Sequence, residues 1–287
     1  MSLATAAFFL QRKKIRTEID GLRASVDRLQ DVFGSLPPYI DGLPSVPKEK
    51  ALEIAVEGLR AEGEKAMEEC RWNEAIEYFN RTLALVNGKD KAVLLSKRGR
   101  CHWVSGNLGE AEADLQQSLQ IAKSMKDSKG QASSLGNIGL IYQDKGDLDQ
   151  ALKYHQDALE IARQIGYRQG EASDLGNIGI VFYLKGELDQ ALKYQQDALK
   201  IHREVGYRQG EASDLGNIGL TYQAKGDLDQ ALKYLNEALK MFEDLGMPQP
   251  MELTKRNIEG ISQQMQQMKP DEKRERTASP KKEKEET

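Results

Sequence analysis

Three asparagines recur at intervals of 40 residues in this chain: Asn137, Asn177 and Asn217. An asparagine amide has two donors and an acceptor, so a row of them can hold the backbone of an extended peptide without reading its side chains. The alternative is that each amide ties its own helix to the neighbouring repeat. We interpret the row as a ligand-binding ladder, because an amide in mid-helix has competing local hydrogen bonds and needs a reason to be there.

Neighbouring residues complete the surface expected around these asparagines. Residues three or four positions apart share one face of a helix, so side chains that follow each asparagine at this spacing are expected to face the same groove. A leucine or isoleucine comes first in each case, which suits a ligand with alternating apolar anchors. The predicted groove residues beside the asparagines are Leu140, Gln143, Ile180, Tyr183, Leu220 and Gln223.

A basic and aromatic cluster precedes this surface in the sequence. Its cations can attract an acidic segment through charge-assisted hydrogen bonds. Ordinary solvated charge is the alternative, because exposed ion pairs and lone cations are common on helical surfaces. The cluster consists of Arg60, Lys97, Arg100 and Trp103, which we include among the predicted groove residues.

The elements that must position these side chains follow from an internal repeat. Residues 146–185 and 186–225 are identical at 29 of 40 positions, and five of the differences are the consecutive positions 180–184. Within one unit, apolar residues spaced three or four apart predict two helices. Gly146 is expected to end the first helix in a left-handed conformation, and Asp147 to cap the second helix with Gln150 as its partner.

These residues resemble the tetratricopeptide repeat, whose pattern includes Leu-Gly and an aromatic residue on the first helix and two alanines on the second. The matching residues of one unit are Ile138, Gly139, Tyr142, Ala151 and Ala158. The 40-residue period, with GNIG and GYRQGEA, resembles kinesin light chains and the Leu-Gly-Asn-repeat spindle-orientation scaffolds. This chain departs from the family pattern in two ways: the length of its repeat differs, and the closing proline is absent.

The resemblance implies an all-α fold, a right-handed α-solenoid of antiparallel helix pairs (a TPR superhelix) whose first helices line a concave groove. Chaperone-binding members hold a carboxylate with a clamp whose matching positions include Glu64 and Ser133 here. Glu64 replaces an amide and Ser133 a lysine, which argues against binding of a chaperone tail.

The repeat phase and the prolines divide the chain into segments. Residues 1–34 form an N-terminal amphipathic helix, 35–50 a Pro-rich linker, 51–268 the repeats and 269–287 a disordered charged tail. The five predicted repeats span 51–88, 89–127, 128–167, 168–207 and 208–247, and a capping helix follows at 248–268.

The predicted N-terminal helix, here called the head, has a row of apolar residues along one face. Three arrangements of the helix would account for this row. It can form a homodimeric coiled coil through residues 8–33, fold back on the solenoid, or attach to a membrane interface through residues 1–16, which include Phe8 and Phe9 beside basic residues. In the tail, Ser279 before Pro280 is either a phosphorylation site or part of a solubilising segment.

Composition excludes several classes of function. The net charge is −4 and no basic surface is expected, so nucleic acid is not a predicted partner. Two cysteines, Cys70 and Cys101, have no paired spacing, which predicts no metal and suits a reducing, cytoplasmic compartment. The three histidines are expected to pack or face solvent, and no catalytic motif or cofactor site is present.

We therefore predict a non-enzymatic scaffold that binds a peptide segment of a partner protein in the concave groove. The alternatives are a ligand-responsive regulator whose superhelix changes pitch on peptide binding, and an adaptor recruited to membranes through the N-terminal helix.

Overall fold

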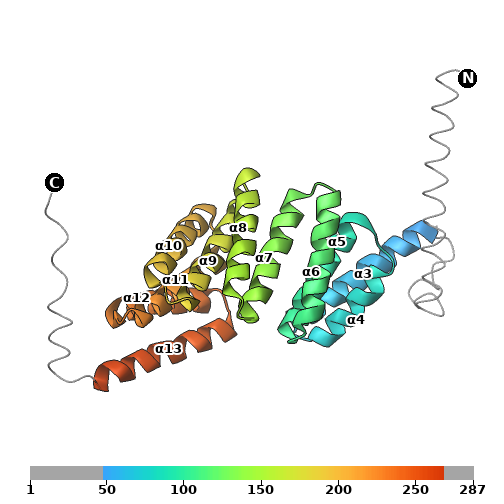
Figure 1. The fold of residues 1–287 in the computed structure, drawn as a ribbon. Helices are drawn as coiled ribbons and strands as arrows, with labels where there is room; N and C mark the ends of the chain where they lie inside the picture. The colour runs from blue at the N-terminus through green and yellow to red at the C-terminus, as the bar shows by residue number, and fades with distance from the viewer. Residues whose placement is uncertain (1–47, 268–287) are drawn as a thin grey trace, which may run out of the picture. The chain divides into compact units, whose positions relative to one another are not determined.

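The computed structural model describes residues 48–267, and every regular element in that range is an α-helix (Figure 1). The predicted head helix, the tail and Ser279 lie outside the described residues. The chain divides into two compact units, unit 1 at Met1–Lys145 and unit 2 at Gly146–Thr287. The division falls inside the third predicted repeat, 128–167, so the repeat boundaries stay a prediction.

Unit 1 contains five described helices, each packed on the next one in the sequence, with a further direct contact between α5 and α7. They are α3 (Lys48–Glu68), α4 (Trp72–Leu83), α5 (Gly88–Val104), α6 (Leu108–Ser124) and α7 (Ser128–Asp144).

Unit 2 contains six described helices with the same order of packing, and here α9 also contacts α11. They are α8 (Leu148–Gln164), α9 (Arg168–Leu184), α10 (Leu188–Val205), α11 (Arg208–Ala224), α12 (Leu228–Asp244) and α13 (Pro248–Gln267). Consecutive antiparallel helix pairs within each unit confirm the predicted all-α repeat solenoid class.

Short turns with a left-handed residue separate the helices. Gly146 has φ +77°, and the Asp147 carboxylate accepts a hydrogen bond from the Gln150 backbone N–H at 3.2 Å, so both local predictions are confirmed. Cys70 and Lys126 take the left-handed position in two turns of unit 1, with φ +58° and +56°. A side chain there costs more than glycine, because its Cβ crowds the following carbonyl.

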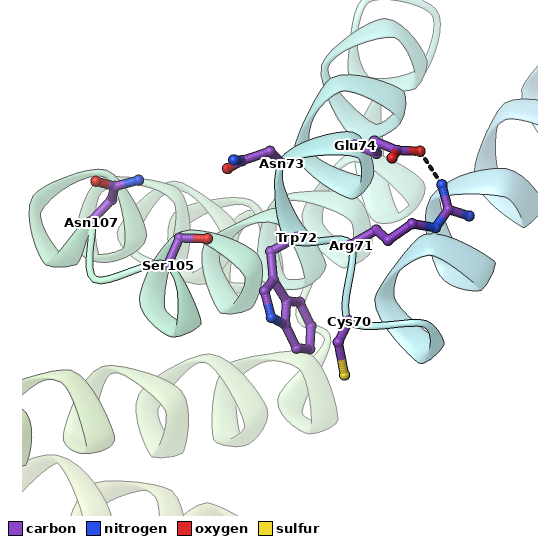
Figure 2. Close-up of a pocket in the computed structure, with 7 residues that line it drawn as sticks. All are labelled: Cys70, Arg71, Trp72, Asn73, Glu74, Ser105 and Asn107. Atoms are coloured by element: carbon purple, nitrogen blue, oxygen red, sulfur yellow. Dashed lines mark hydrogen bonds and ion pairs between the residues drawn. The ribbon is translucent and has the colours of Figure 1, made fainter.

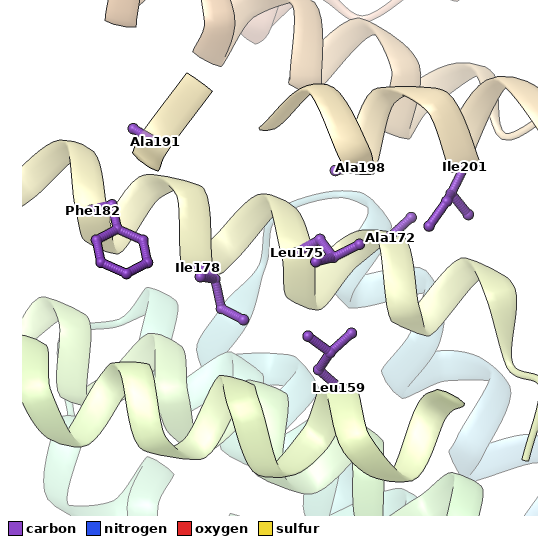
Figure 3. Close-up of a cluster of buried hydrophobic side chains, with 8 residues drawn as sticks. All are labelled: Leu159, Ala172, Leu175, Ile178, Phe182, Ala191, Ala198 and Ile201. Carbon is purple, nitrogen blue, oxygen red and sulfur yellow. The ribbon is translucent and has the colours of Figure 1, made fainter. Parts of the chain in front are cut away.

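The core of unit 2 is built where α9 lies between α8 and α10 (Figure 3). Ile178 of α9 is fully buried and packs in one cluster with Leu159 of α8 and Ile201 of α10. Burying such a side chain contributes about 1.5–3 kcal/mol. Ala191 and Ala198 of α10 have no exposed surface. Their short side chains allow α10 to approach α9 closely.

Glycine in the first helix of a pair also sets how closely its partner approaches. A Cβ added to Gly179 of α9 would lie 2.7 Å from Gln195 Cγ and 3.1 Å from the Ala191 carbonyl oxygen on α10. Both distances are shorter than van der Waals contact. The predicted packing role of glycine at this phase of the repeat is therefore confirmed at Gly179.

Unit 2 also buries two histidine–aspartate contacts. His202 Nδ1 of α10 lies 2.6 Å from Asp214 Oδ2 of α11, and His155 Nδ1 of α8 lies 3.8 Å from Asp174 Oδ1 of α9. Burial raises the pKa of Asp174 and Asp214, while the histidine partner acts in the opposite direction in each pair. The sequence left both packing and surface positions open for the histidines, and His155 and His202 take the packing one, since both are buried.

Candidate functional site

Two of the three ladder asparagines lie on the neighbouring helices α9 and α11 of unit 2. Asn177 and Asn217 are both half-buried. Neither side-chain amide hydrogen-bonds to another described residue, although the Asn217 carbonyl oxygen accepts a bond from Thr221. An amide that is held in place and has no partner is available to a ligand.

The helix faces around these amides carry no exposed charge. Between Ala172 and Leu184 the only Asp, Glu, Lys or Arg is Asp174, and between Ala212 and Ala224 it is Asp214. Both aspartates are buried and contact histidines, so their carboxylates do not reach the surface. Ordinary surface helices carry charges throughout their exposed face, which makes this stretch unusual for a solvated surface.

The remaining predicted groove residues of unit 2 are half-buried as well. Ile180 and Leu220 follow the two asparagines by three residues, and Tyr183 and Gln223 by six. Leu184 at the end of α9 is 49% exposed. The face therefore combines partnerless amides with apolar side chains that are only partly covered.

Asn137 of unit 1 has a different environment from its two equivalents. Its Nδ2 lies 3.4 Å from Ser96 Oγ on α5, a long hydrogen bond to the neighbouring first helix. The alternative role for the ladder, joining adjacent repeats, thus has support at Asn137. Leu140 and Gln143 on the same helix are half-buried.

The predicted basic cluster in unit 1 contains its own counter-ion. Arg60 Nε lies 3.1 Å from Glu64 Oε1, and the Lys97 ammonium contacts the same carboxylate from α5. These contacts, chiefly the Lys97 hydrogen bond, lower the pKa of Glu64. Two of the predicted cations therefore share one carboxylate instead of facing a ligand freely.

The other two residues of that cluster have separate environments. Trp103 is half-buried, and its Nε1–H donates to the Asp144 carboxylate of α7. Arg100 is exposed and forms no ion pair with a described residue. Arg100 is the cation of this cluster that remains available.

A cavity of about 320 Å³ opens beside Arg100, between α5, α6 and α7. Sequence reasoning named four of the residues that line it, Lys97, Arg100, Ser133 and Asn137, but not its other serines. One feature of the sequence could have pointed to them: Ser134 stands where later repeats have Asp174 and Asp214. The newly recognised lining residues include Ser96, Ser118, Gly130 and Ser134.

A second cavity, of about 540 Å³, lies at the turns that follow α3 and α5 (Figure 2). Its lining includes Cys70, Trp72 and Asn107, and the guanidinium of Arg71 is held by Glu69 and Glu74. None of the predicted groove residues lies here. The charged groups are paired with one another, so the cavity presents no free ion to a ligand.

Metal-ligating groups and the buried thiol were the remaining features to locate in the described residues. Within 48–267, no group of three His, Cys, Asp or Glu side chains could hold a metal ion. Burial raises the pKa of the Cys101 thiol to about 11, which leaves that thiol protonated and unreactive. No helix in the described range has the length and apolar character needed to cross a membrane.

The tetratricopeptide repeat model matches residues 90–164, 130–204 and 171–244. These overlapping matches cover more than half of the 287 residues. The chain belongs to the tetratricopeptide repeat (TPR) family. TPR domains typically bind proteins or peptides, and the repeat scaffold is generally non-catalytic.

Several solved structures share this fold. The Rap conjugation gene regulator of plasmid pLS20, in complex with the Phr* peptide, is 18% identical with a TM-score of 0.69, over 86% of this chain and 68% of that one. BtubC from P. vanneervenii is 16% identical with a TM-score of 0.57, over 81% and 92% of the two chains.

A putative kinesin light chain of Podosopora anserina with nearly identical TPR-like repeats is 13% identical, with a TM-score of 0.51, over 67% of this TPR chain and 97% of that one. At these identities the likeness shows the fold alone. No curated protein sequence matches the chain.

Proposed function

We propose that this TPR protein is a scaffold that binds an extended, uncharged peptide segment of a partner protein across α9 and α11. The observation that carries the proposal is the pair of partnerless amides, Asn177 and Asn217, on neighbouring helices within a face that has no exposed charge. The amides would bond the peptide backbone, while Ile180 and Leu220 would contact its apolar side chains.

The comparisons support this proposal at the level of the family. TPR domains typically bind peptides or proteins, and one structure with the same fold contains a bound peptide. The regulator whose superhelix changes pitch and the membrane-recruited adaptor stay predictions, and the head segment that the adaptor needs lies outside the described residues.

The proposal is tested by selecting peptides from a displayed random library on the full chain and measuring their affinity by fluorescence anisotropy. We expect the selected sequences to be apolar and poor in charge. Replacing both Asn177 and Asn217 with Ala should weaken binding about ten- to hundredfold, because two amides each lose hydrogen bonds worth about 0.5–1.5 kcal/mol.

A matched control is Asn236→Ala on α12. Asn236 is exposed, and its amide donates to the Leu232 carbonyl oxygen within its own helix. This variant should bind like the wild type and keep the same helicity. The proposal fails if the library yields no binders, or if the double variant binds the selected peptides as tightly as the control.

A further inference from the structure

Asn87 immediately precedes α5 in unit 1, and Gly88 is the first residue of that helix; they are the only Asn-Gly pair in the chain. In such a pair the backbone nitrogen of the glycine can attack the side-chain amide carbon of the asparagine, because glycine has no Cβ to obstruct the approach. In a folded protein the reaction needs two further conditions. The asparagine side chain must be free to turn, and the glycine nitrogen must not be held by a hydrogen bond.

Both conditions are met at Asn87. Its side chain is exposed and makes no capping hydrogen bond to α5, although Asn87 occupies the N-cap position. The Gly88 N–H donates to no described residue. It lies in the first turn of a helix, where the N–H groups have no partner within the helix itself. The two reacting groups are therefore both unrestrained.

The surroundings of the pair leave room for the reaction. Asn87 is extended, with φ −136° and ψ 176°, and Gly88 has φ +60°. The atoms nearest to the place of a Cβ on Gly88 belong to the Met125 side chain, at 3.6 and 3.7 Å. Met125 is 48% exposed, so this flexible side chain can move aside. The pair can therefore change its torsion angles without entering a packed core.

The other asparagines of the chain lack this combination. Asn107 is the matched case, because it is also exposed, also precedes a helix, α6, and also makes no capping bond. The next residue is Leu108, however, and its N–H donates to the Gly106 carbonyl oxygen at 3.0 Å. The leucine side chain and this hydrogen bond both keep the nitrogen from Asn107. The remaining asparagines lie inside helices, and none of them precedes a glycine.

We propose that Asn87 is a site of spontaneous deamidation in the folded protein. The Gly88 nitrogen forms a bond to Asn87 Cγ and loses its proton, the bond from Cγ to the side-chain nitrogen breaks, and ammonia leaves. A cyclic succinimide remains. Water then opens the ring at either carbonyl group and gives aspartate or isoaspartate. The whole reaction consumes one water and releases one ammonia, with no oxidation or reduction.

The products change the start of α5 in two ways. Both carry a new carboxylate, and the dipole of a helix favours a negative charge at its N-terminus. The charge arises two residues before Lys89, whose ammonium lies 3.3 Å from the Asp127 carboxylate that caps α7. Isoaspartate also routes the backbone through the former side chain, which adds a methylene group to the connection between α4 and α5.

This connection is fixed on both sides of the pair. Leu85, two residues before Asn87, is 4% exposed and packs in one cluster with Leu52 of α3. On the other side, α5 carries the Lys97 ammonium that contacts Glu64 of α3. Isoaspartate should therefore strain the start of α5, whereas aspartate keeps the ordinary backbone. None of this depends on the proposed function.

The test follows the full chain during incubation at neutral pH. Samples are digested in mild acid, so that digestion itself causes no deamidation, and mass spectrometry detects the gain of about 1 Da that marks the reaction. Conversion at Asn87 should be at least about tenfold faster than at Asn107, because only Asn87 precedes a glycine. A parallel sample unfolded in urea supplies the rate of an unrestrained chain, and the native rate at Asn87 should lie within about tenfold of it.

Variants separate the site from general ageing of the protein. Asn87→Gln should stop the reaction, because glutamine would have to form a larger ring, and should keep the helicity of the wild type. Asn107→Gln should leave the rate at Asn87 unchanged. Hydrogen exchange at the start of α5 should be faster in the separated isoaspartate form than in the Asn87→Asp variant, which has the same added charge on an ordinary backbone.

An Asn87 that stays intact in the native chain, under conditions that convert it in urea, would overturn the proposal, because the fold would then protect the pair. Equal rates at Asn87 and Asn107 would overturn it as well. Equal hydrogen exchange in the isoaspartate form and the Asn87→Asp variant would overturn the inferred strain at α5.

Discussion

The α5–α6–α7 junction of unit 1 and the α9–α10–α11 junction of unit 2 use the same helix arrangement with opposite results. In unit 2 a buried histidine and aspartate, His202 and Asp214, fill the space behind the groove. In unit 1 the equivalent residues are Ala122 and Ser134, and Ser134 lines a cavity of about 320 Å³. The chemistry of a groove in this protein is therefore set partly by residues behind the helices that line it.

The carboxyl groups of the two units also differ, in the direction in which their pKa values are shifted. In unit 1, partners lower the pKa of Glu64, Glu112 and Asp127, and the largest cause in each case is a hydrogen bond. In unit 2, burial raises the pKa of Asp174 and Asp214. These three carboxylates of unit 1 are held by cations and N–H groups, whereas Asp174 and Asp214 of unit 2 are buried beside histidines.

The largest effect is expected on removing one member of the buried pair in unit 2. His202→Ala leaves Asp214 buried without its partner and should lower the free energy of unfolding of unit 2 by about 3 kcal/mol. Hydrogen exchange of the α9–α11 amides measures this loss locally. Adding Asp214→Ser, which gives the residues of unit 1, should restore most of it. A double variant as unstable as the single one would show that the pair is not the cause.

A smaller effect is expected at two glycines that occupy equivalent positions. A Cβ on Gly216 of α11 would meet nothing within 4 Å, whereas one on Gly176 of α9 would lie 3.2 Å from Asp214 Oδ1. Gly216→Ala should stabilise the protein by about 0.5–1 kcal/mol through lower backbone entropy. Gly176→Ala should not stabilise the protein, because its Cβ would crowd Asp214 Oδ1. Urea unfolding of the two variants measures the difference, and equal gains would contradict the close contact at Asp214.

The smallest effect is expected from pH, because the ion pairs at Glu64 and Glu112 are partly exposed and screened. The lowered pKa values of unit 1 stabilise it above pH 4.5, and this contribution is lost as pH falls through the folded-state values. The raised pKa values of Asp174 and Asp214 stabilise unit 2 below pH 3.8, and this contribution is lost as pH rises through the folded-state values.

Acidification from pH 6 to pH 4 should therefore weaken unit 1 relative to unit 2. Hydrogen exchange measured separately for α3–α7 and for α8–α13 at each pH, corrected for the intrinsic exchange rate, reports this difference. Asp214→Asn is the control, since it should reduce the response of unit 2 and leave that of unit 1 unchanged. Parallel loss of protection in both units would contradict the opposite pKa shifts.

The sequence predicted the local structure well, because helix ends depend on residues close to them. The turn at Gly146 and the cap at Asp147 were predicted from their own neighbours, and the family resemblance was confirmed by the repeat match. The contact of Lys97 with Glu64 was not predicted, because these residues lie 33 positions apart and meet only when α5 packs beside α3.

The cavity beside Arg100 could not be predicted for a related reason. Its lining residues come from three helices, α5, α6 and α7, and a serine such as Ser134 does not by itself indicate a cavity. The asparagine ladder was found from its spacing, but spacing does not reveal that Asn137 bonds Ser96 while Asn177 and Asn217 have no such partner. Whether these residues bind a ligand stays a prediction.

The left-handed glycines have a consequence for how repeats can be added to such a protein by duplication. A Cβ added at Gly146, Gly186 or Gly226 would meet nothing within 4 Å, so these turns are held by backbone conformation and not by packing. The two near-identical segments, 146–185 and 186–225, each begin at such a glycine. A duplication joined at these points inserts a complete helix pair without cutting through a core. Each new copy then brings a further asparagine to the groove, whose neighbours are free to diverge.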